Sequence, residues 1–203
     1  NHKTSKLSER ELFIINDSNQ DDFINFFKEE FGHFVGSFFS LSTCNRTEVY
    51  YFGEPGTSIS VAQKTLEFLG CDDIVRDGLY FFDEEAAIEH MCCVASGLDS
   101  QVLGEQEILG QFKKSVQNYT KLGFLNNQLL RVTDEIISIA KAARTETKVG
   151  HNPLSVSGLS LKIVQEIFED PTQQKLTIVG AGQMAMNVIE NFYENGIKNI
   201  QAV

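Results

Sequence analysis

One cysteine stands where a nucleophile could be both held in place and exposed. Cys44 lies in the polar segment 42–47, which separates two runs of aromatic and β-branched residues. Such runs predict strands, so Cys44 is expected in a tight turn between them. Arg46 could favour the thiolate, which is the reactive form of cysteine. Alternatively, Asn45 and Arg46 cap the turn and satisfy backbone carbonyls, and these residues taken alone leave both interpretations open.

A second polar group lies in the segment 97–111, which contains two glycines within a helical pattern. Each glycine in a helix costs about 1 kcal/mol relative to alanine, so Gly104 and Gly110 suggest the close approach of a backbone or ligand. Gly104 would share one helix face with Glu107 and Gln111. Helix–helix packing is the alternative, and it explains the glycines better than it explains the clustered polar side chains.

A histidine precedes this segment on an expected helix. His90 is followed by Met91, Cys92 and Cys93, and a single histidine in such surroundings is more often a packed residue than a catalyst. It gains interest because a cysteine nucleophile commonly needs a partner for proton transfer.

Near the end of the chain, a strand-forming run at residues 176–179 leads into a GxGxxA turn and then a helical pattern. This order is that of a dinucleotide-binding fingerprint, in which the glycines admit a pyrophosphate to the backbone and the helix N-terminus. An ordinary glycine turn is the alternative. The residues of the turn are Gly180, Ala181, Gly182, Gln183, Met184 and Ala185.

The elements that must position these groups follow from periodicity and turn signals. Strands are expected at 34–41, 48–52, 79–82, 176–179 (buried) and 200–203, and helices at Gln20–Phe31, 57–69, 84–96, 102–122, 125–148, 156–168 and 183–195. The prediction is an α+β catalytic domain at 1–150, with a small antiparallel sheet and packed helices. A linker helix and the first βα unit of a Rossmann-type α/β domain are expected at 151–203, after a break at 150–153.

Composition excludes several other classes. The 203 residues include 17 Lys+Arg and 28 Asp+Glu, a formal net charge of −11. No apolar run approaches the ~18 residues of a membrane span, no signal-peptide core follows the start, and the four cysteines lack metal-site spacing. A reducing cytoplasm is therefore expected. Only residues 111–150, with seven basic and three acidic side chains, could attract a polyanion.

Together these segments resemble the glutamyl-tRNA reductase family, whose members begin tetrapyrrole synthesis. The resemblance rests on four segments: NHKT at 1–4, LSTCNRTE at 41–48, ASGLDSQVLGEQEILGQFK at 95–113, and RTET at 144–147 with the glycine turn after it. It covers essentially the whole chain but about the first half of the family's length, so a truncated protein is inferred. Ser5 and Lys6 stand where the family usually has Ala-Pro, away from the chemistry.

The resemblance implies that Cys44 attacks the ester of glutamyl-tRNA to form a thioester, which NADPH reduces to glutamate-1-semialdehyde. His90 would assist catalysis, and the glycine turn would hold NADPH. The implied glutamate pocket consists of Thr43, Cys44, Asn45, Arg46, Ser100, Glu105, Gln106, Glu107 and Gln111. Within it, Arg46 suits the substrate carboxylate and Glu105 its ammonium group.

The resemblance also implies partners. The family dimerises through a C-terminal domain beyond this chain and is expected to pass its product to glutamate-1-semialdehyde aminomutase. Two alternatives remain: a non-catalytic aminoacyl-tRNA-binding module, and a form limited to glutamyl-tRNA esterase activity. Weak tRNA binding is expected, because phosphate contacts supply most of the affinity for tRNA and the chain is strongly acidic.

Overall fold

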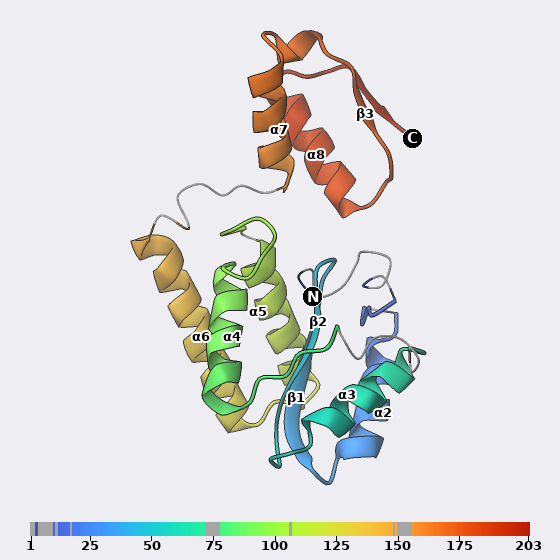
Figure 1. Ribbon diagram of the computed structural model, residues 1–203, viewed down its shortest axis with the longest axis vertical. Coiled ribbons are helices and arrows are strands. Elements are labelled where there is room, and N and C mark those ends of the chain that lie inside the picture. Colours follow the sequence, from blue (N-terminus) through green and yellow to red (C-terminus); the bar gives the residue numbers. More distant parts are fainter. Residues whose placement is uncertain are drawn as a thin grey trace.

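A computed structural model describes residues 3, 10, 12–16, 18–71, 78–105, 107–147, 149 and 156–203. Its centre is a hairpin of two antiparallel strands, β1 (Val35–Ser42) and β2 (Thr47–Gly53), in which Ser42 pairs with Thr47. This pairing confirms the predicted strands and leaves residues 43–46 as the tight turn. Helices flank the hairpin on both sides (Figure 1).

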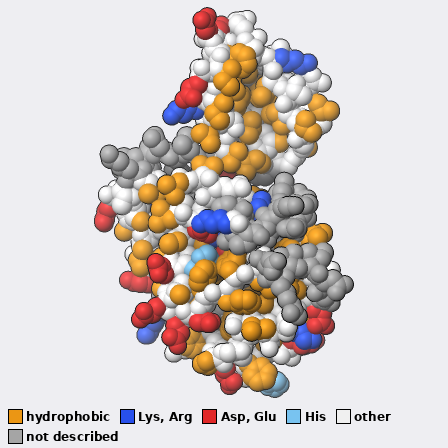
Figure 2. All heavy atoms as spheres, viewed as in Figure 1, with side chains coloured by type: hydrophobic (Ala, Val, Ile, Leu, Met, Phe, Trp, Pro, Cys, Tyr) orange, Lys and Arg blue, Asp and Glu red, His pale blue; other side chains and the backbone are white. Residues whose placement is uncertain are grey.

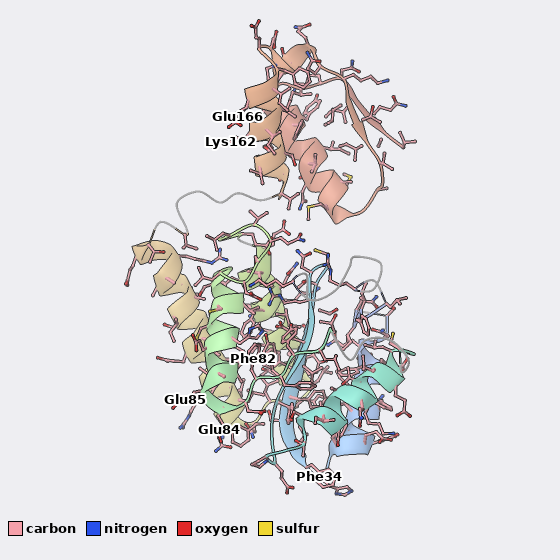
Figure 3. All side chains as sticks on the ribbon, viewed as in Figure 1. Phe34, Phe82, Glu84, Glu85, Lys162 and Glu166 are labelled. Atoms are coloured by element: carbon pink, nitrogen blue, oxygen red, sulfur yellow. The ribbon has the colours of Figure 1, made fainter. Side chains whose placement is uncertain are left out.

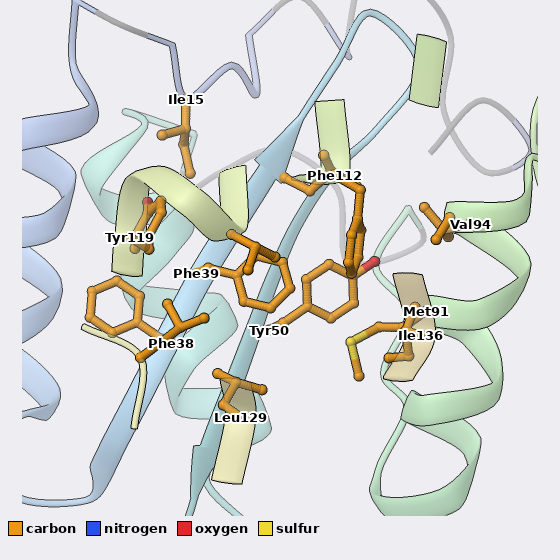
Figure 4. Packing of buried hydrophobic residues seen from close by; sticks show 14 of the residues in the cluster. Ile15, Phe38, Phe39, Tyr50, Met91, Val94, Phe112, Tyr119, Leu129 and Ile136 are labelled. Atoms are coloured by element: carbon orange, nitrogen blue, oxygen red, sulfur yellow. The ribbon is translucent and has the colours of Figure 1, made fainter. Parts of the chain in front are cut away.

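Aromatic side chains explain why the hairpin is buried on both faces. Phe38 stacks on Phe27 of α2 (Gln20–Phe31), with ring centroids 4.2 Å apart. The next residue, Phe39, points to the opposite face because side chains alternate along a strand, and there it packs against Tyr50 and Phe112 (Figure 4). The resulting core anchors the strand that ends at the Cys44 turn.

Four further helices are described in this part of the fold: α3 (Ser58–Phe68), α4 (Glu84–Ser96), α5 (Glu107–Lys121) and α6 (Asn127–Glu146). α6 begins where the Asn126 side chain accepts a bond from Leu129 N, a typical N-cap. α4 ends at Gly97, whose φ of 79° is readily adopted only by glycine. The predicted helices are confirmed except at residues 102–105. These residues are not helical, and α5 begins only at Glu107.

A second unit contains α7 (Val156–Ile167), the short helix η2 (Pro171–Gln173), β3 (Leu176–Ile178), α8 (Gln183–Glu194) and β4 (Ile200–Ala202). β3 and β4 are parallel, with α8 as the connection between them. A small core of Leu161, Phe192 and Ile197 lies between α7 and α8.

Two strand predictions need correction. Residues 79–82 form no strand, because the segment packs its aromatic rings against α4 and makes no ladder with the hairpin. β3 is not a buried strand: Val179, at its expected end, is 87% exposed, since only one neighbouring strand is present among the described residues.

The domain break predicted at 150–153 lies outside the described residues. Among the described helices, none combines the length and the apolar character that crossing a membrane requires.

Candidate functional site

Cys44 lies in the turn between β1 and β2, as the sequence predicted, and its side chain is exposed. The turn is closed by a bond from Thr43 N to the Arg46 carbonyl (2.8 Å), and Asn45 N donates to Thr43 Oγ1 (3.1 Å). The backbone of the candidate nucleophile is therefore fixed while its sulfur stays accessible.

Arg46 points away from solvent and is only 2% exposed. Its Nη1 lies 3.0 Å from Glu48 Oε1 and 3.0 Å from Asp99 Oδ2, and Nη2 donates to the Asp99 carbonyl. Lys3 pairs with the same Asp99 carboxylate. Arg46 thus joins the turn to the segment after α4 in an array of alternating charges.

The surroundings of Cys44 do not support the expectation that Arg46 favours its thiolate. Partial burial of the thiol raises the Cys44 pKa, and the Glu105 and Glu107 carboxylates raise it further. A backbone hydrogen bond and, more weakly, the charge of Arg10 oppose this rise without cancelling it. Arg46 is not among the main influences on this pKa, because its guanidinium pairs with Glu48 and Asp99 instead. The cysteine is therefore a protonated thiol in the ligand-free protein at neutral pH.

The segment between α4 and α5 forms a folded loop that carries Ser100 and Glu105. Gly104 N donates to the Gly97 carbonyl across the loop (2.9 Å), and Arg144 of α6 donates to the Glu105 carbonyl. Ser100 bonds to the Glu105 carboxylate, whose pKa is nevertheless raised by burial and by Glu107. The loop thus brings an acidic group near Cys44.

Gly104 has φ 78°, and a Cβ there would lie 2.5 Å from the Val149 carbonyl oxygen. The predicted close approach of a backbone is confirmed at this glycine. No such approach is seen at Gly110, where an added Cβ would meet no atom within 4 Å outside the backbone of its own helix. The prediction that Gly104 shares a helix face with Glu107 and Gln111 is wrong, because Gly104 precedes α5.

The remaining predicted pocket residues differ in their surroundings. Glu107 and Gln111 are exposed on α5, and Asn187 of α8 donates to Glu107 Oε1 over 3.2 Å. Gln106 lies outside the described residues.

His90 lies on α4 and contacts a buried carboxylate that the sequence analysis did not single out. Its Nε2 is 2.9 Å from Oε1 of Glu48. Phe82 stacks on the imidazole with centroids 4.5 Å apart, between α4 and the hairpin in Figure 3. A charged residue in an otherwise apolar strand pattern was the available signal for Glu48.

Glu48 is the centre of a polar cluster. Arg46 Nη1, the Tyr50 and Tyr80 hydroxyls and His90 Nε2 all bond to its carboxylate. Burial raises the pKa of Glu48, but the bond from His90 and the charge of Arg46 outweigh it, so the pKa is lowered. The carboxylate is therefore ionised although it is buried.

A cavity of about 200 Å³ lies between β2, α3 and residues 78–83. Glu48 and His90 are among its lining residues, whereas Cys44 does not line it. The described residues contain no group of three or more metal-ligating side chains.

The glycine turn of the second unit leaves open space beside its backbone. Gly180 has φ 109°, and α8 begins directly after Gly182, with no side chain capping its N-terminus. A Cβ at either glycine would have no atom within 4 Å. None of the described residues therefore fills the space where a phosphate group could approach the amides of the turn.

Comparison with known proteins places this fold and site in one class. The family model for the N-terminal domain of glutamyl-tRNA reductase matches residues 1–147. The chain therefore belongs to the glutamyl-tRNA reductase family.

Individual relatives agree. Glutamyl-tRNA reductase from Saccharophagus degradans is 38% identical over 161 residues, which cover 79% of this chain and 38% of the relative. The enzyme from Desulfotalea psychrophila is 32% identical over 98% of this chain and 47% of its own length. The solved structure from Methanopyrus kandleri is 28% identical with a TM-score of 0.67, covering 99% of this chain and 47% of that one. The chain thus spans about half the length of its relatives, or less.

Proposed function

We propose that this chain forms the acyl-transfer part of a glutamyl-tRNA reductase that supplies tetrapyrrole synthesis. Cys44 Sγ attacks the ester carbonyl of glutamyl-tRNA, the C–O bond to the tRNA 3′ end breaks, and a glutamyl thioester forms. The observation that carries the proposal is an exposed cysteine on a rigid turn, with acidic and imidazole groups on the adjoining elements.

The protonated thiol sets a requirement for this step. Because burial and the carboxylates raise the Cys44 pKa, the proton must leave as the substrate binds. A substrate ammonium group beside Glu105 would offset the negative charge that disfavours the thiolate. We assign His90 the assisting role in moving the proton, as the resemblance implies.

The glutamate pocket would be formed by the turn and the loop, with Thr43, Asn45 and Ser100 as neutral polar contacts, the carboxylates Glu105 and Glu107, and the amides Gln106 and Gln111. Arg46 would bind the substrate carboxylate only by exchanging one of its two ion pairs. Asp99 is the more exposed of the two partners, so that pair is the one expected to open.

Gly180 to Ala185 fit a dinucleotide pyrophosphate, because the turn offers uncapped amides and unfilled space. Bound NADPH would supply the hydride that converts the thioester to glutamate-1-semialdehyde and frees the thiolate. Under this proposal 151–203 is a linker helix and the beginning of a Rossmann-type domain after a catalytic domain at 1–150. A cytoplasmic homodimer that passes its product to an aminomutase completes the proposed context.

Acid-quenched labelling tests the acylation step. The protein is incubated with glutamyl-tRNA carrying radiolabelled glutamate, and label on the protein is measured for the wild type, Cys44→Ser and Cys93→Ser. Label is expected on the wild type and on Cys93→Ser, because Cys93 lies on α4 away from the turn, and its loss is expected in Cys44→Ser. A folded wild type that neither takes up label nor speeds deacylation would contradict the proposal and favour a binding module.

A further inference from the structure

The carboxylate of Glu48 is buried, accepts four bonds and has no assigned role. We propose that Glu48 is a positioning residue that holds His90 with its proton on Nε2, leaving Nδ1 as the atom that accepts a proton during Cys44 chemistry. The assignment of Nδ1 to that chemistry rests on the proposed function, whereas the tautomer follows from the cluster alone.

The hydrogen-bond donors and acceptors of the cluster determine the tautomer of His90. An ionised carboxylate can only accept hydrogen bonds, and Arg46 and the hydroxyls of Tyr50 and Tyr80 already donate to Glu48. The contact between Glu48 Oε1 and His90 Nε2, at 2.9 Å, therefore needs its proton from the imidazole. In a neutral ring with Nε2–H, the lone pair lies on Nδ1.

Charge balance keeps Glu48 ionised. Arg46 lies between two carboxylates, with Nη1 at 3.0 Å from Glu48 and from Asp99, and Lys3 pairs with Asp99. Two cations and two anions therefore cancel before His90 is counted. A neutral imidazole that donates to Glu48 completes the cluster without leaving a buried charge uncompensated.

Packing restrains the rotation of the His90 ring that would exchange its two nitrogens. Phe82 stacks on one face at an interplanar angle of 25°, and the Tyr80 ring contacts the imidazole edge-on, with centroids 5.6 Å apart. Because the Tyr80 hydroxyl is itself bonded to Glu48, the same carboxylate orients the imidazole and one of the rings that surround it.

Nitrogen-15 NMR of the histidine rings tests the tautomer without any substrate. At mildly alkaline pH the wild type is expected to show the Nε2–H form for His90, identified among the four histidines by its loss in His90→Gln. A predominant Nδ1–H form in the wild type overturns the proposal, whether or not any variant folds.

The Glu48→Gln variant tests the positioning role, with Glu30→Gln as the control because Glu30 pairs with Lys64 on the surface. We expect a mixture of tautomers and about tenfold slower Cys44 acylation in folded Glu48→Gln, and neither change in Glu30→Gln. Acylation at the wild-type rate in folded Glu48→Gln overturns the role. If Cys44 of the wild type takes up no label, the proposed function is contradicted. The NMR result on the His90 tautomer does not depend on that outcome.

Discussion

The thiol of Cys44 lies among carboxylates, and this arrangement restrains its reactivity. Burial, Glu105 and Glu107 all disfavour the thiolate. The buried guanidinium of Arg46 pairs with Glu48 and Asp99. A resting thiol is useful in a cell because unbound thiolates react with oxidants and alkylating agents. Substrate binding would then activate the nucleophile.

Replacing Glu105 with Gln should make Cys44 more reactive toward small alkylating agents. Removing a nearby negative charge lowers the thiol pKa, so the thiolate fraction at neutral pH rises. The rate of iodoacetamide modification at Cys44, followed by mass spectrometry of its peptide, is expected to rise several-fold. Glu85→Gln, at the remote start of α4, should leave the rate unchanged, and an equal or lower rate in Glu105→Gln would contradict the electrostatic account.

Glu48 should make stability depend on acidity. Its folded-state pKa lies below the usual 4.5 because His90 and Arg46 favour the ionised form. The stabilisation is therefore complete above the unfolded-state value and is lost as the pH falls through the folded one. Urea unfolding should show Glu48→Gln about 3 kcal/mol less stable than wild type at neutral pH, with the gap narrowing on acidification. A gap independent of pH would argue that Glu48 is not ionised.

The loop between α4 and α5 is the element that brings the candidate pocket together. Its two ends meet through the bond from Gly104 N to the Gly97 carbonyl, and Arg144 of α6 donates to it at Glu105. The RTET segment at 144–147 therefore stabilises the site indirectly, since Arg144 contacts the loop backbone and not the turn of Cys44. Both glycines adopt positive φ angles that other residues adopt only with strain.

Gly104→Ala and Gly110→Ala should have opposite effects on stability. At position 104 the added Cβ meets the Val149 carbonyl at 2.5 Å and the backbone stays at φ 78°, so the free energy of unfolding should fall by about 1–3 kcal/mol. At position 110, inside α5 and open to solvent, alanine should stabilise the helix by about 0.5–1 kcal/mol. Urea denaturation measures both, and equal effects would contradict the difference assigned to the loop.

The N-terminus of α8 offers a test of the nucleotide site. Gly182 has φ −76°, which any residue adopts, and a Cβ there would meet no atom of the described residues within 4 Å. Gly182→Val should therefore leave the melting temperature nearly unchanged but weaken NADPH binding, measured by fluorescence titration, at least about tenfold by blocking the pyrophosphate. Unchanged affinity would place the cofactor elsewhere.

Across the protein, charge opposes the binding of a polyanion. The net charge is −11, and acidic side chains gather at the lower-left edge of the face in Figure 2, where Figure 3 labels Glu84 and Glu85 on α4. The basic side chains of 111–147 lie on α5 and α6 instead. These helices are the surface on which a tRNA backbone would meet least repulsion.

Binding of glutamyl-tRNA by the chain should accordingly be weak and should involve α5. Fluorescence anisotropy at rising salt measures it, with Lys113→Glu compared against Lys28→Glu on α2. Loss of one phosphate contact should reduce the salt slope by about 1 in Lys113→Glu, while Lys28→Glu should behave as wild type. Tight, strongly salt-sensitive binding by the wild-type chain would contradict the prediction.

The order of elements, the exposed cysteine turn and the glycine turn could all be predicted from local patterns. The helix Gln20–Phe31 and the two strands of the hairpin could be predicted because each depends on the spacing of apolar residues only a few positions apart. Cys44 is exposed because short polar turns between strands lie at the surface. These features depend on neighbours in the sequence, which is why the chain alone specifies them.

The partners of the charged residues depend on folding. Arg46 and Glu48 are two residues apart, yet what surrounds them comes from Asp99 and His90 on other elements. Local sequence could not show that Arg46 is neutralised, or that residues 79–82 pack on α4 instead of forming a strand. Electrostatic and packing energies act between groups distant along the chain, so only the folded protein shows that carboxylates lie near the thiol and that a buried glutamate contacts the histidine.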